Sequence, residues 1–161
     1  MNVIKYQKSL KLILFLSIFA LVSAYFIQYV LGHQPCNLCL FERVPYLSSI
    51  IIILSCFYFK KFEKISLILL SLIFFFATIL SFYHFGIEQG FIKESLVCNL
   101  SVGDNFINPE ELLKSLKEKP ISCKDVTFRL FGLSLATINI FISLILSVIT
   151  LKLFLDYEKN K

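Results

Sequence analysis

The sequence predicts an all-α membrane protein, a bundle of four transmembrane helices joined on one side by two outward loops. Hydrophobic residues make up 57% of the 161 positions, and the mean hydropathy is +0.79, well above that of soluble domains. The apolar residues form long runs, and the charged residues, 17% of the chain, stand mostly between them. We therefore expect one integral membrane domain covering residues 1–161.

The first predicted span covers residues 12–31. It follows a segment with three lysines and contains 20 residues without a charge, enough to cross a hydrocarbon core of about 30 Å. A cleaved signal peptide is the alternative, because the basic start, the apolar core and the tripeptide from Val22 to Ala24 resemble a cleavage site. The apolar run continues to Leu31, which favours a membrane span.

The second predicted span, residues 44–59, is short, so we expect the cysteine-bearing segment before it to form its first turns. Pro45 cannot donate a hydrogen bond to the carbonyl of Phe41, which predicts a kink close to the membrane surface. The basic connection at 60–64 leads directly into the third span, residues 65–85. A connection this short joins antiparallel neighbours.

The fourth predicted span covers residues 130–151. Near its start, Gly132, Ser134 and Ala136 are small residues that allow close contact between helices. Asn139 is a polar residue within the span, and we expect it to hydrogen-bond across a helix interface rather than to bind a ligand.

A polar region, residues 86–129, separates the third and fourth spans. Within it, Asn108 and Pro109 begin a short predicted helix that extends to Lys119, where Pro120 stops it. The leucines of this helix lie on one side. The helix is therefore amphipathic and is expected to pack on the protein's own loop or to lie flat on the lipid bilayer.

The charges predict the orientation of the four spans. The amino-terminal segment, the 60–64 connection and the tail from Lys152 hold nine Lys and three acidic residues, whereas the other side holds seven basic and eight acidic residues. The positive-inside rule then predicts cytoplasmic termini and outward segments at about 32–43 and 86–129. This orientation explains the net charge of +5, and the absence of a basic stripe with interleaved aromatic residues argues against a nucleic-acid partner.

Five cysteines occur, and four of them lie in the outward segments, where disulfides persist. Cys36 and Cys39 form a CxxC motif, whereas Cys98 and Cys123 stand 25 positions apart. A zinc site is disfavoured, because it needs a second closely spaced pair or histidines. A structural disulfide suits the distant pair, but a bridge within CxxC closes too small a loop to restrain the unfolded chain, which favours exchange chemistry. Cys56, late in the second span, is predicted to be a small buried residue.

The surroundings of the CxxC motif favour a reactive pair. Pro35 suits a helix N-terminus, where the dipole and free N–H groups stabilise a thiolate. If the helix continues, Cys36 and Cys39 share a face, and Arg43 adds a positive charge to that face. Since the sequence has no dinucleotide-binding glycine pattern, electrons leaving this site are expected to reach a lipid-soluble acceptor, such as a quinone.

Several motifs together resemble the bacterial inner-membrane disulfide bond formation protein B (DsbB) family, and the resemblance covers nearly the whole chain in order. The motifs are Pro35-Cys36-x-x-Cys39-x-x-Glu42-Arg43, then Tyr83-His84-x-Gly86-x-Glu88-x-Gly90, then Cys98 and Cys123, and finally Phe131-Gly132-x-Ser134-x-Ala136-x-x-Asn139. The family often has Trp in the second outward loop, and this chain has none. That departure concerns the choice of partner more than the chemistry.

The resemblance implies a relay of disulfide exchange at the periplasmic side of the inner membrane. A reduced DsbA-like, thioredoxin-fold oxidase would attack Cys98, and Cys123 would pass the electrons on to Cys36 and Cys39. Cys39 would then meet the quinone, ubiquinone or menaquinone. The resemblance also implies three quinone-site residues, Arg43, His84 and Glu42. Arg43 would stabilise negative charge on the quinone oxygen.

Two other functions are open from the sequence. A four-span scaffold with two structural disulfides would need no reactive cysteine. A relative of the vitamin K epoxide reductase type shares the four-helix, four-cysteine plan, but its CxxC tends to fall late in the chain, whereas here it comes first.

His33 has no motif partner and is expected to be a surface histidine.

Overall fold

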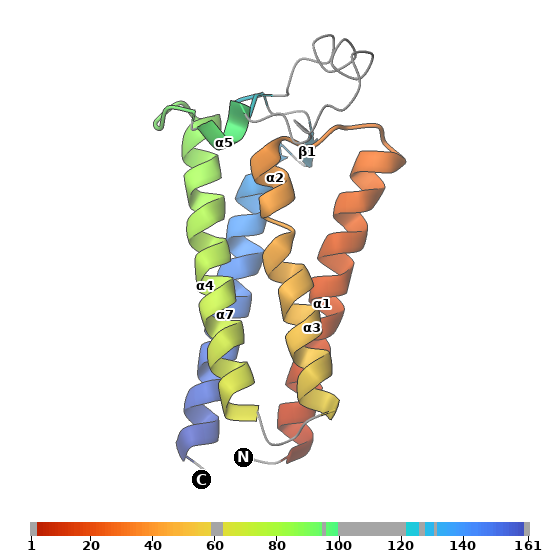
Figure 1. Ribbon diagram of the computed structural model, residues 1–161, viewed down its shortest axis with the longest axis vertical. Coiled ribbons are helices and arrows are strands. Elements are labelled where there is room, and N and C mark those ends of the chain that lie inside the picture. Colours follow the sequence, from red (N-terminus) through yellow and green to blue (C-terminus); the bar gives the residue numbers. More distant parts are fainter. Residues whose placement is uncertain are drawn as a thin grey trace, which may run out of the picture.

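The structure, a computed structural model, describes residues 3–58, 63–94, 96–99, 122–125, 128–130 and 132–159, and side chains from residue 7 onward except those of residues 96 and 99. Long helices dominate these ranges (Figure 1). The predicted amphipathic helix at 108–119 lies outside the described residues. In chain order the elements are α1 (Val3–Tyr29), α2 (Asn37–Phe41), α3 (Val44–Tyr58), α4 (Glu63–Glu88), α5 (Leu96–Asn99), β1 (Arg129–Leu130), β2 (Leu133–Ser134) and α7 (Leu135–Lys159).

Within the described ranges, four segments are long and apolar enough to cross a membrane, which confirms the predicted fold class. They are Gln7–Tyr29, Asn37–Tyr58, Glu63–Glu88 and Leu135–Lys159. The second combines α2 and α3, so the CxxC segment does open that span, as expected. Both ends of the chain lie at one end of the bundle, and α2, α5 and β1 lie at the other (Figure 1).

The second span is interrupted where Pro45 predicts a kink. α2 ends at Phe41, a turn at Glu42 and Arg43 follows, and α3 begins at Val44. Pro45 has no N–H to offer the Phe41 carbonyl, so the helical hydrogen-bond ladder cannot run through this point. From this turn, Glu42 contacts His84 of α4, and Arg43 contacts Gln28 of α1.

The fourth helix begins later than predicted, at Leu135 rather than near residue 130. A short antiparallel hairpin of β1 and β2 precedes it, with Leu130 opposite Leu133. Gly132 has a φ of +84°, a value that favours glycine and suits a tight turn. The prediction that Gly132 serves as a helix contact is therefore wrong, whereas Ala136 is buried at the start of α7.

The third helix extends to Glu88, three positions beyond the predicted end at residue 85, so Glu88 belongs to the helix and not to the loop. Gly90, with a φ of +78°, follows the helix as a left-handed cap, and the chain turns back so that Ile92 N–H donates to the Gly86 carbonyl over 3.1 Å. A Cβ at Gly86 would lie 2.6 Å from Ile92 Cδ1, so glycine permits this close return.

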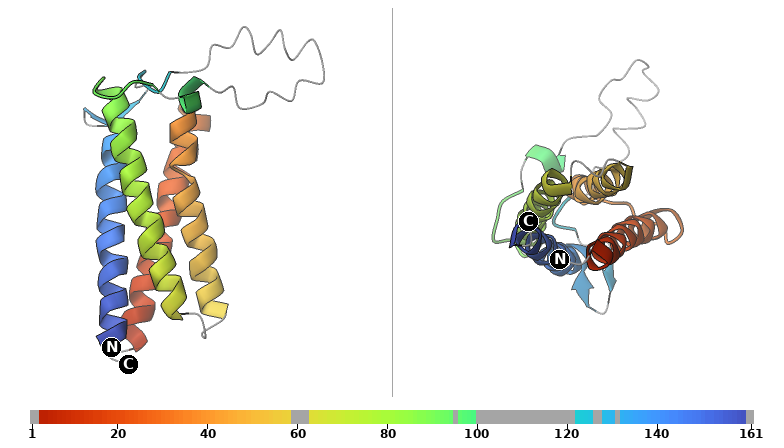
Figure 2. Two further views of the ribbon diagram at one scale, coloured as in Figure 1. Left: turned by 60° about the vertical axis from the view of Figure 1, so that its left-hand side comes forward. Right: turned by 90° about the horizontal axis from the view of Figure 1, so that it is seen from below.

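The four long helices pack side by side, with α4 against both α3 and α7, and α1 against α3 (Figure 2). Short polar contacts join them, because Ser49 donates to Ser17 over 2.9 Å and Thr78 to Ser143 over 3.1 Å. Phenylalanines such as Phe76, 66% exposed, also cover the outside, as a lipid-facing surface requires. The buried residues that we call the bundle core are Leu10, Ile13, Tyr46, Ile53, Cys56, Leu67, Leu70, Phe74, Leu146 and Leu153.

Candidate functional site

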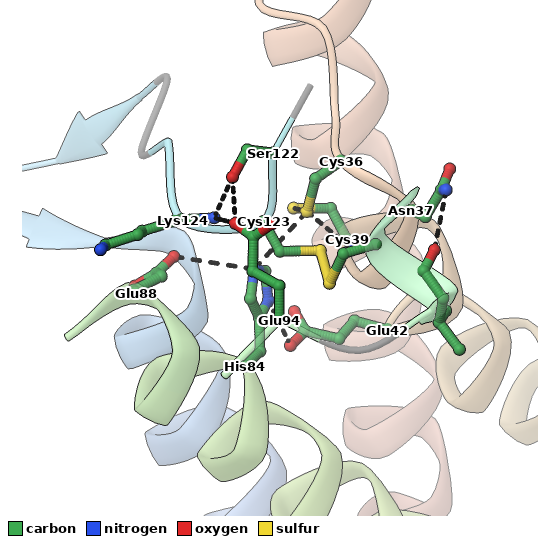
Figure 3. Close-up of a disulfide and its surroundings, with 12 residues drawn as sticks. Cys36, Asn37, Cys39, Glu42, His84, Glu88, Glu94, Ser122, Cys123 and Lys124 are labelled. Atoms are coloured by element: carbon green, nitrogen blue, oxygen red, sulfur yellow. Dashed lines mark hydrogen bonds and ion pairs between the residues drawn. A yellow bond between two sulfur atoms is a disulfide. The ribbon is translucent and has the colours of Figure 1, made fainter. Parts of the chain in front are cut away.

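All four predicted outward cysteines lie together, and Figure 3 shows Cys36, Cys39 and Cys123 of this group. α2 and α5, which carry Cys39 and Cys98, lie at the end of the bundle opposite the termini (Figure 1). They come from the segment before α2, from α2 itself, from α5 and from the 122–125 segment. Cys36, Cys98 and Cys123 are buried with Leu38 and Ile87, and Cys39 packs at their edge; we call this group the cysteine cluster. Cys56 lies apart from it in the bundle core, which confirms its predicted role as a small buried residue.

The CxxC motif forms the N-terminus of α2. Cys36 is the N-cap residue, and its sulfur accepts a hydrogen bond from the Cys39 N–H over 3.3 Å. The two sulfur atoms lie 2.9 Å apart, and both residues are thiols. Pro35 and the apolar residues after Cys36 explain this placement, because the chain leaves an extended segment and enters the helix at the first cysteine.

His84 of α4 contacts the CxxC pair from the neighbouring helix. Its side chain is 2% exposed, and its Nε2 lies 3.5 Å from Cys36 Sγ. On the other side of the ring, Nδ1 lies 3.0 Å from Glu42 Oε1. A carboxylate oxygen accepts, so Nδ1 carries the hydrogen and Nε2 is the nitrogen that faces sulfur.

Asn139 of α7 holds Glu42 from the side opposite His84. Its Nδ2 donates to Glu42 Oε2 over 3.1 Å and to Ser81 Oγ over 2.7 Å, while its Oδ1 accepts from the Tyr46 hydroxyl. Asn139 therefore joins α7 to α3 and α4, as the sequence predicts. The resulting chain of contacts, from Tyr46 to Cys36, is buried at the membrane end of the cysteine cluster.

The pKa of the Cys36 thiol is lowered from 9.0 to about 5, chiefly because the Cys39 thiol donates a hydrogen bond to its sulfur. Burial acts in the opposite direction, and His84 adds to the lowering through its hydrogen bond and its charge. Cys36 is therefore a thiolate over most of the physiological pH range, the form that attacks disulfides and binds metals.

The second cysteine pair is a disulfide between Cys98 and Cys123, with Cα atoms 5.6 Å apart. Glu94 holds the 122–125 segment in place, since its Oε1 accepts from the Ser122 hydroxyl and from the Lys124 N–H. The two pairs are tied together by an amide within the CxxC motif. Asn37 Nδ2 donates to the carbonyl of Val97, the residue before Cys98, over 2.9 Å.

A small cavity of about 20 Å³ opens between the two pairs. Cys36, Cys39 and Cys123 line it together with His84 and Glu88, and Cys98 does not. Glu88 Oε1 lies 3.8 Å from His84 Nε2, and its side chain is 6% exposed (Figure 3). The other carboxylate oxygen, Oε2, is buried and has no hydrogen-bond partner among the described residues.

Arg43 stands in the turn between α2 and α3, after the helix that carries Cys39 has ended. Its guanidinium turns to α1, where Nη1 donates to Gln28 Oε1 over 2.6 Å and the group lies 4.9 Å from the centre of the Tyr25 ring. Glu42 is neither solvated nor paired with Arg43, since it contacts His84 and Asn139.

Sequence reasoning missed the placement of Glu88, Asn37 and Glu94. Glu88 could have been found, because it stands at i+4 from His84 and so shares its helical face. Asn37 and Glu94 gave no signal, since their partners come from distant segments. His33, predicted to be a surface histidine, is half-buried, with its ring 5.1 Å from that of Phe128.

A family model that matches most of the chain identifies the family to which the protein belongs. The family model for disulfide bond formation protein DsbB matches residues 7–153. The chain belongs to the DsbB family. This DsbB-family protein is thus a multi-pass membrane protein of the disulfide-forming thiol oxidoreductase class.

An uncharacterised protein of Rickettsia prowazekii (strain Madrid E) is similar to this DsbB-family chain along almost its whole length. It is 32% identical over 156 residues, which cover 95% of this chain and 90% of the relative. None of the solved structures matches the chain.

Proposed function

We propose that this protein oxidises the dithiol of a periplasmic DsbA-like, thioredoxin-fold oxidase and passes the electrons to a membrane quinone, ubiquinone or menaquinone. The observation that carries the proposal is the cysteine cluster, in which two cysteine pairs from distant segments meet beside one cavity. Two disulfides that only stabilised the fold would not need to lie next to each other. Exchange requires the sulfur atoms of one pair to reach those of the other.

The first exchange takes place at the Cys98–Cys123 disulfide. A thiolate of the partner attacks Cys98 Sγ, a mixed disulfide forms, and Cys123 leaves as a thiolate. The second partner thiolate then displaces Cys98, so that the partner departs oxidised and two electrons stay on this pair. Cys98 is 1% exposed, and the attack therefore requires a local opening around α5.

The second exchange passes these electrons to the CxxC pair. Cys123 is the suitable donor, because it lines the same cavity as Cys36 and Cys39. Its thiolate attacks Cys36 of the oxidised pair, Cys39 leaves, and Cys98 then displaces Cys36 to close the Cys98–Cys123 bond again. The products are two thiols in the CxxC motif and a disulfide in the other pair.

Reoxidation of Cys36 and Cys39 releases two electrons and two protons, which a bound quinone would accept. His84 Nε2, 3.5 Å from Cys36 Sγ, can hold one of the protons, and Glu42 keeps the imidazole oriented. The cavity of about 20 Å³ is too small for a quinone ring. The quinone would therefore approach Cys39 from outside this cavity. Arg43, whose guanidinium lies over the Tyr25 ring of α1, is the cation that we propose for it.

We place the protein in the bacterial inner membrane with cytoplasmic termini and a periplasmic cysteine cluster. The excess of lysines at the terminal end and the location of the cluster at the other end support this orientation (Figure 1). In intact cells, a membrane-impermeant thiol reagent should label a Gln89→Cys variant and spare a Lys159→Cys variant. The reverse pattern would contradict the orientation.

The test of the function uses the purified protein in detergent, a reduced thioredoxin-fold oxidase and a soluble quinone analogue. We expect the quinone absorbance to fall as the partner is oxidised, and both signals to disappear in Cys36→Ser. That variant should still form a mixed disulfide with the partner, which Cys98→Ser should not. Cys56→Ser, which lies outside the cysteine cluster, is the matched control and should behave like the unchanged protein. Quinone reduction that persists in Cys36→Ser would refute the proposal.

A further inference from the structure

We propose that the reduced CxxC pair is also a zinc site, in which Cys36, Cys39 and His84 bind the ion and Glu88 completes the coordination. Ligand atoms of the first three residues lie within 4.8 Å of one another. The zinc site that sequence spacing disfavours becomes possible because the fold brings a histidine from α4 to the cysteines. The metal would hold the pair in its reduced form, and this consequence rests on the proposed relay.

The distances suit a tetrahedral ion with sulfur and nitrogen ligands. Zinc binds thiolate sulfur at about 2.3 Å and imidazole nitrogen at about 2.0 Å, so a sulfur and a nitrogen ligand lie roughly 3.5 Å apart. Cys36 Sγ and His84 Nε2 are 3.5 Å apart. The two sulfur atoms, now 2.9 Å apart, would separate to roughly 3.8 Å, a movement that the half-buried Cys39 side chain can make by rotating.

The orientation of His84 is that of a metal ligand. Histidine ligands commonly donate their second ring N–H to a carboxylate, which fixes the tautomer and strengthens the ligand. Glu42 Oε1 occupies this position, 3.0 Å from Nδ1, and Asn139 holds the other Glu42 oxygen. The Nε2 lone pair is thereby directed toward the cavity between the cysteines.

Glu88 provides independent evidence that a cation binds here. Its side chain is 6% exposed and lines the same cavity, yet its Oε2 has no hydrogen-bond partner among the described residues. A buried carboxylate oxygen without a partner is costly, and a bound cation would satisfy it. A volume of about 20 Å³ holds one water-sized ligand, so it can hold a single ion.

Zinc binding would compete with oxidation of the CxxC pair, although it transfers no electrons itself. Zn²⁺ would bind the Cys36 thiolate, the Cys39 sulfur after it loses its proton, and His84 Nε2 after it loses its proton. The pair stays reduced until the ion leaves. Only then can Cys36 and Cys39 lose two electrons to form their disulfide. Because soft sulfur and nitrogen ligands favour zinc over hard cations, Mg²⁺ should not have this effect.

The experiment titrates Zn²⁺ alone into reduced, metal-free protein in detergent, against a chromogenic chelator. A Cys98→Ser, Cys123→Ser background keeps the second pair from contributing thiols. We expect one ion per chain and at least hundredfold weaker binding once Cys36 and Cys39 are joined as a disulfide. Co²⁺ in place of zinc should give the visible absorption of tetrahedral thiolate coordination.

Matched variants assign the ligands. His84→Ala should weaken binding at least tenfold and Glu88→Gln several-fold, whereas His33→Ala and Cys56→Ser should leave it unchanged. Circular dichroism checks that each variant is folded. If His84→Ala does not fold, Cys39→Ser provides the test. Its Co²⁺ complex should show weaker thiolate absorption than that of the unchanged protein, because one thiolate ligand is lost.

The outcomes separate this inference from the proposed function, because the binding assay needs neither a thiol partner nor a quinone. Zinc that binds the reduced pair and slows quinone reduction, with recovery on adding a chelator, supports the inference. Equal zinc affinity of the reduced and the disulfide forms, or equal affinity in His84→Ala and His33→Ala, overturns it while leaving the relay intact. Zinc binding in a protein that reduces no quinone would contradict the proposed function alone.

Discussion

The two ends of the bundle differ in the kinds of side chain that they bury. The bundle core, toward the termini, is filled almost entirely by aliphatic and aromatic side chains such as Phe74 and Leu146. At the opposite end, a sulfur atom of the cysteine cluster contacts His84, and His84 in turn is hydrogen-bonded to Glu42; both residues are buried. The first arrangement holds helices together, whereas the second places groups that gain and lose protons and electrons where water is scarce.

The comparison explains why Cys36, just before the second span, differs from Cys56, within that span. Cys56 is 4% exposed within the bundle core and acts as a small apolar residue. Cys36, with a similar exposure of 6%, has a sulfur and an imidazole as neighbours. Burial alone therefore does not determine reactivity in this protein. The chemical nature of the neighbours does.

The largest effect that we expect concerns the protonation of Cys36. With its pKa lowered to about 5, the thiolate should be present above that pH and disappear below it. At pH 6 its thiolate fraction should exceed that of an ordinary thiol roughly a thousandfold. The ultraviolet thiolate absorbance of reduced, metal-free protein, minus that of Cys36→Ser, measures the titration. A midpoint near 9, or one that His84→Ala does not raise, would contradict the account.

A smaller effect should follow from Glu42→Gln, which keeps the size of the side chain and removes the charge that orients His84. We expect quinone reduction to slow about a hundredfold, the lower range for positioned acid–base groups. Mixed-disulfide formation at Cys98 should keep its rate. Glu63→Gln, at the other end of α4, is the control and should change neither step. Equal slowing of both steps would mean that Glu42 supports the fold and not the CxxC pair.

The smallest effect should appear in the bundle core. Phe74 is fully buried, and Phe74→Ala would leave a cavity of about 100 Å³, worth about 2 kcal/mol of unfolding free energy. The transfer from water adds little, since lipid is as apolar as the core. Phe76→Ala, at a side chain 66% exposed, should cost much less. Thermal unfolding in detergent measures both, and equal losses would contradict the assignment of Phe74 to the core.

The fold could be predicted from sequence because the membrane imposes a simple rule. Long uncharged runs become helices, and lysines orient them, so the four spans needed no knowledge of tertiary contacts. The kink at Pro45 also follows from one missing N–H. The hairpin before α7 could not be anticipated in the same way, because its residues are as apolar as a helix end and only the turn at Gly132 separates the two.

The site was predicted less completely than the fold. Motifs located the cysteines and His84, but the contacts of Glu42 and Arg43 depend on the turn between α2 and α3, which sends one side chain to α4 and the other to α1. The unpartnered oxygen of Glu88 is a property of packing and leaves no trace in the sequence. Such features emerge only when separate segments of the chain are brought together, as Cys36 and His84 are with their separation of 48.

The central claim is that electrons pass from Cys123 to Cys36 across the cavity that both residues line. The most direct measurement uses a Cys39→Ser, Cys98→Ser double variant, in which Cys36 and Cys123 keep their thiols but have lost their usual partners. After mild oxidation, mass spectrometry of proteolytic fragments should find a disulfide that joins Cys36 to Cys123. If both thiols remain unpaired, or if Cys123 pairs only between molecules, the two cysteine pairs do not form one relay.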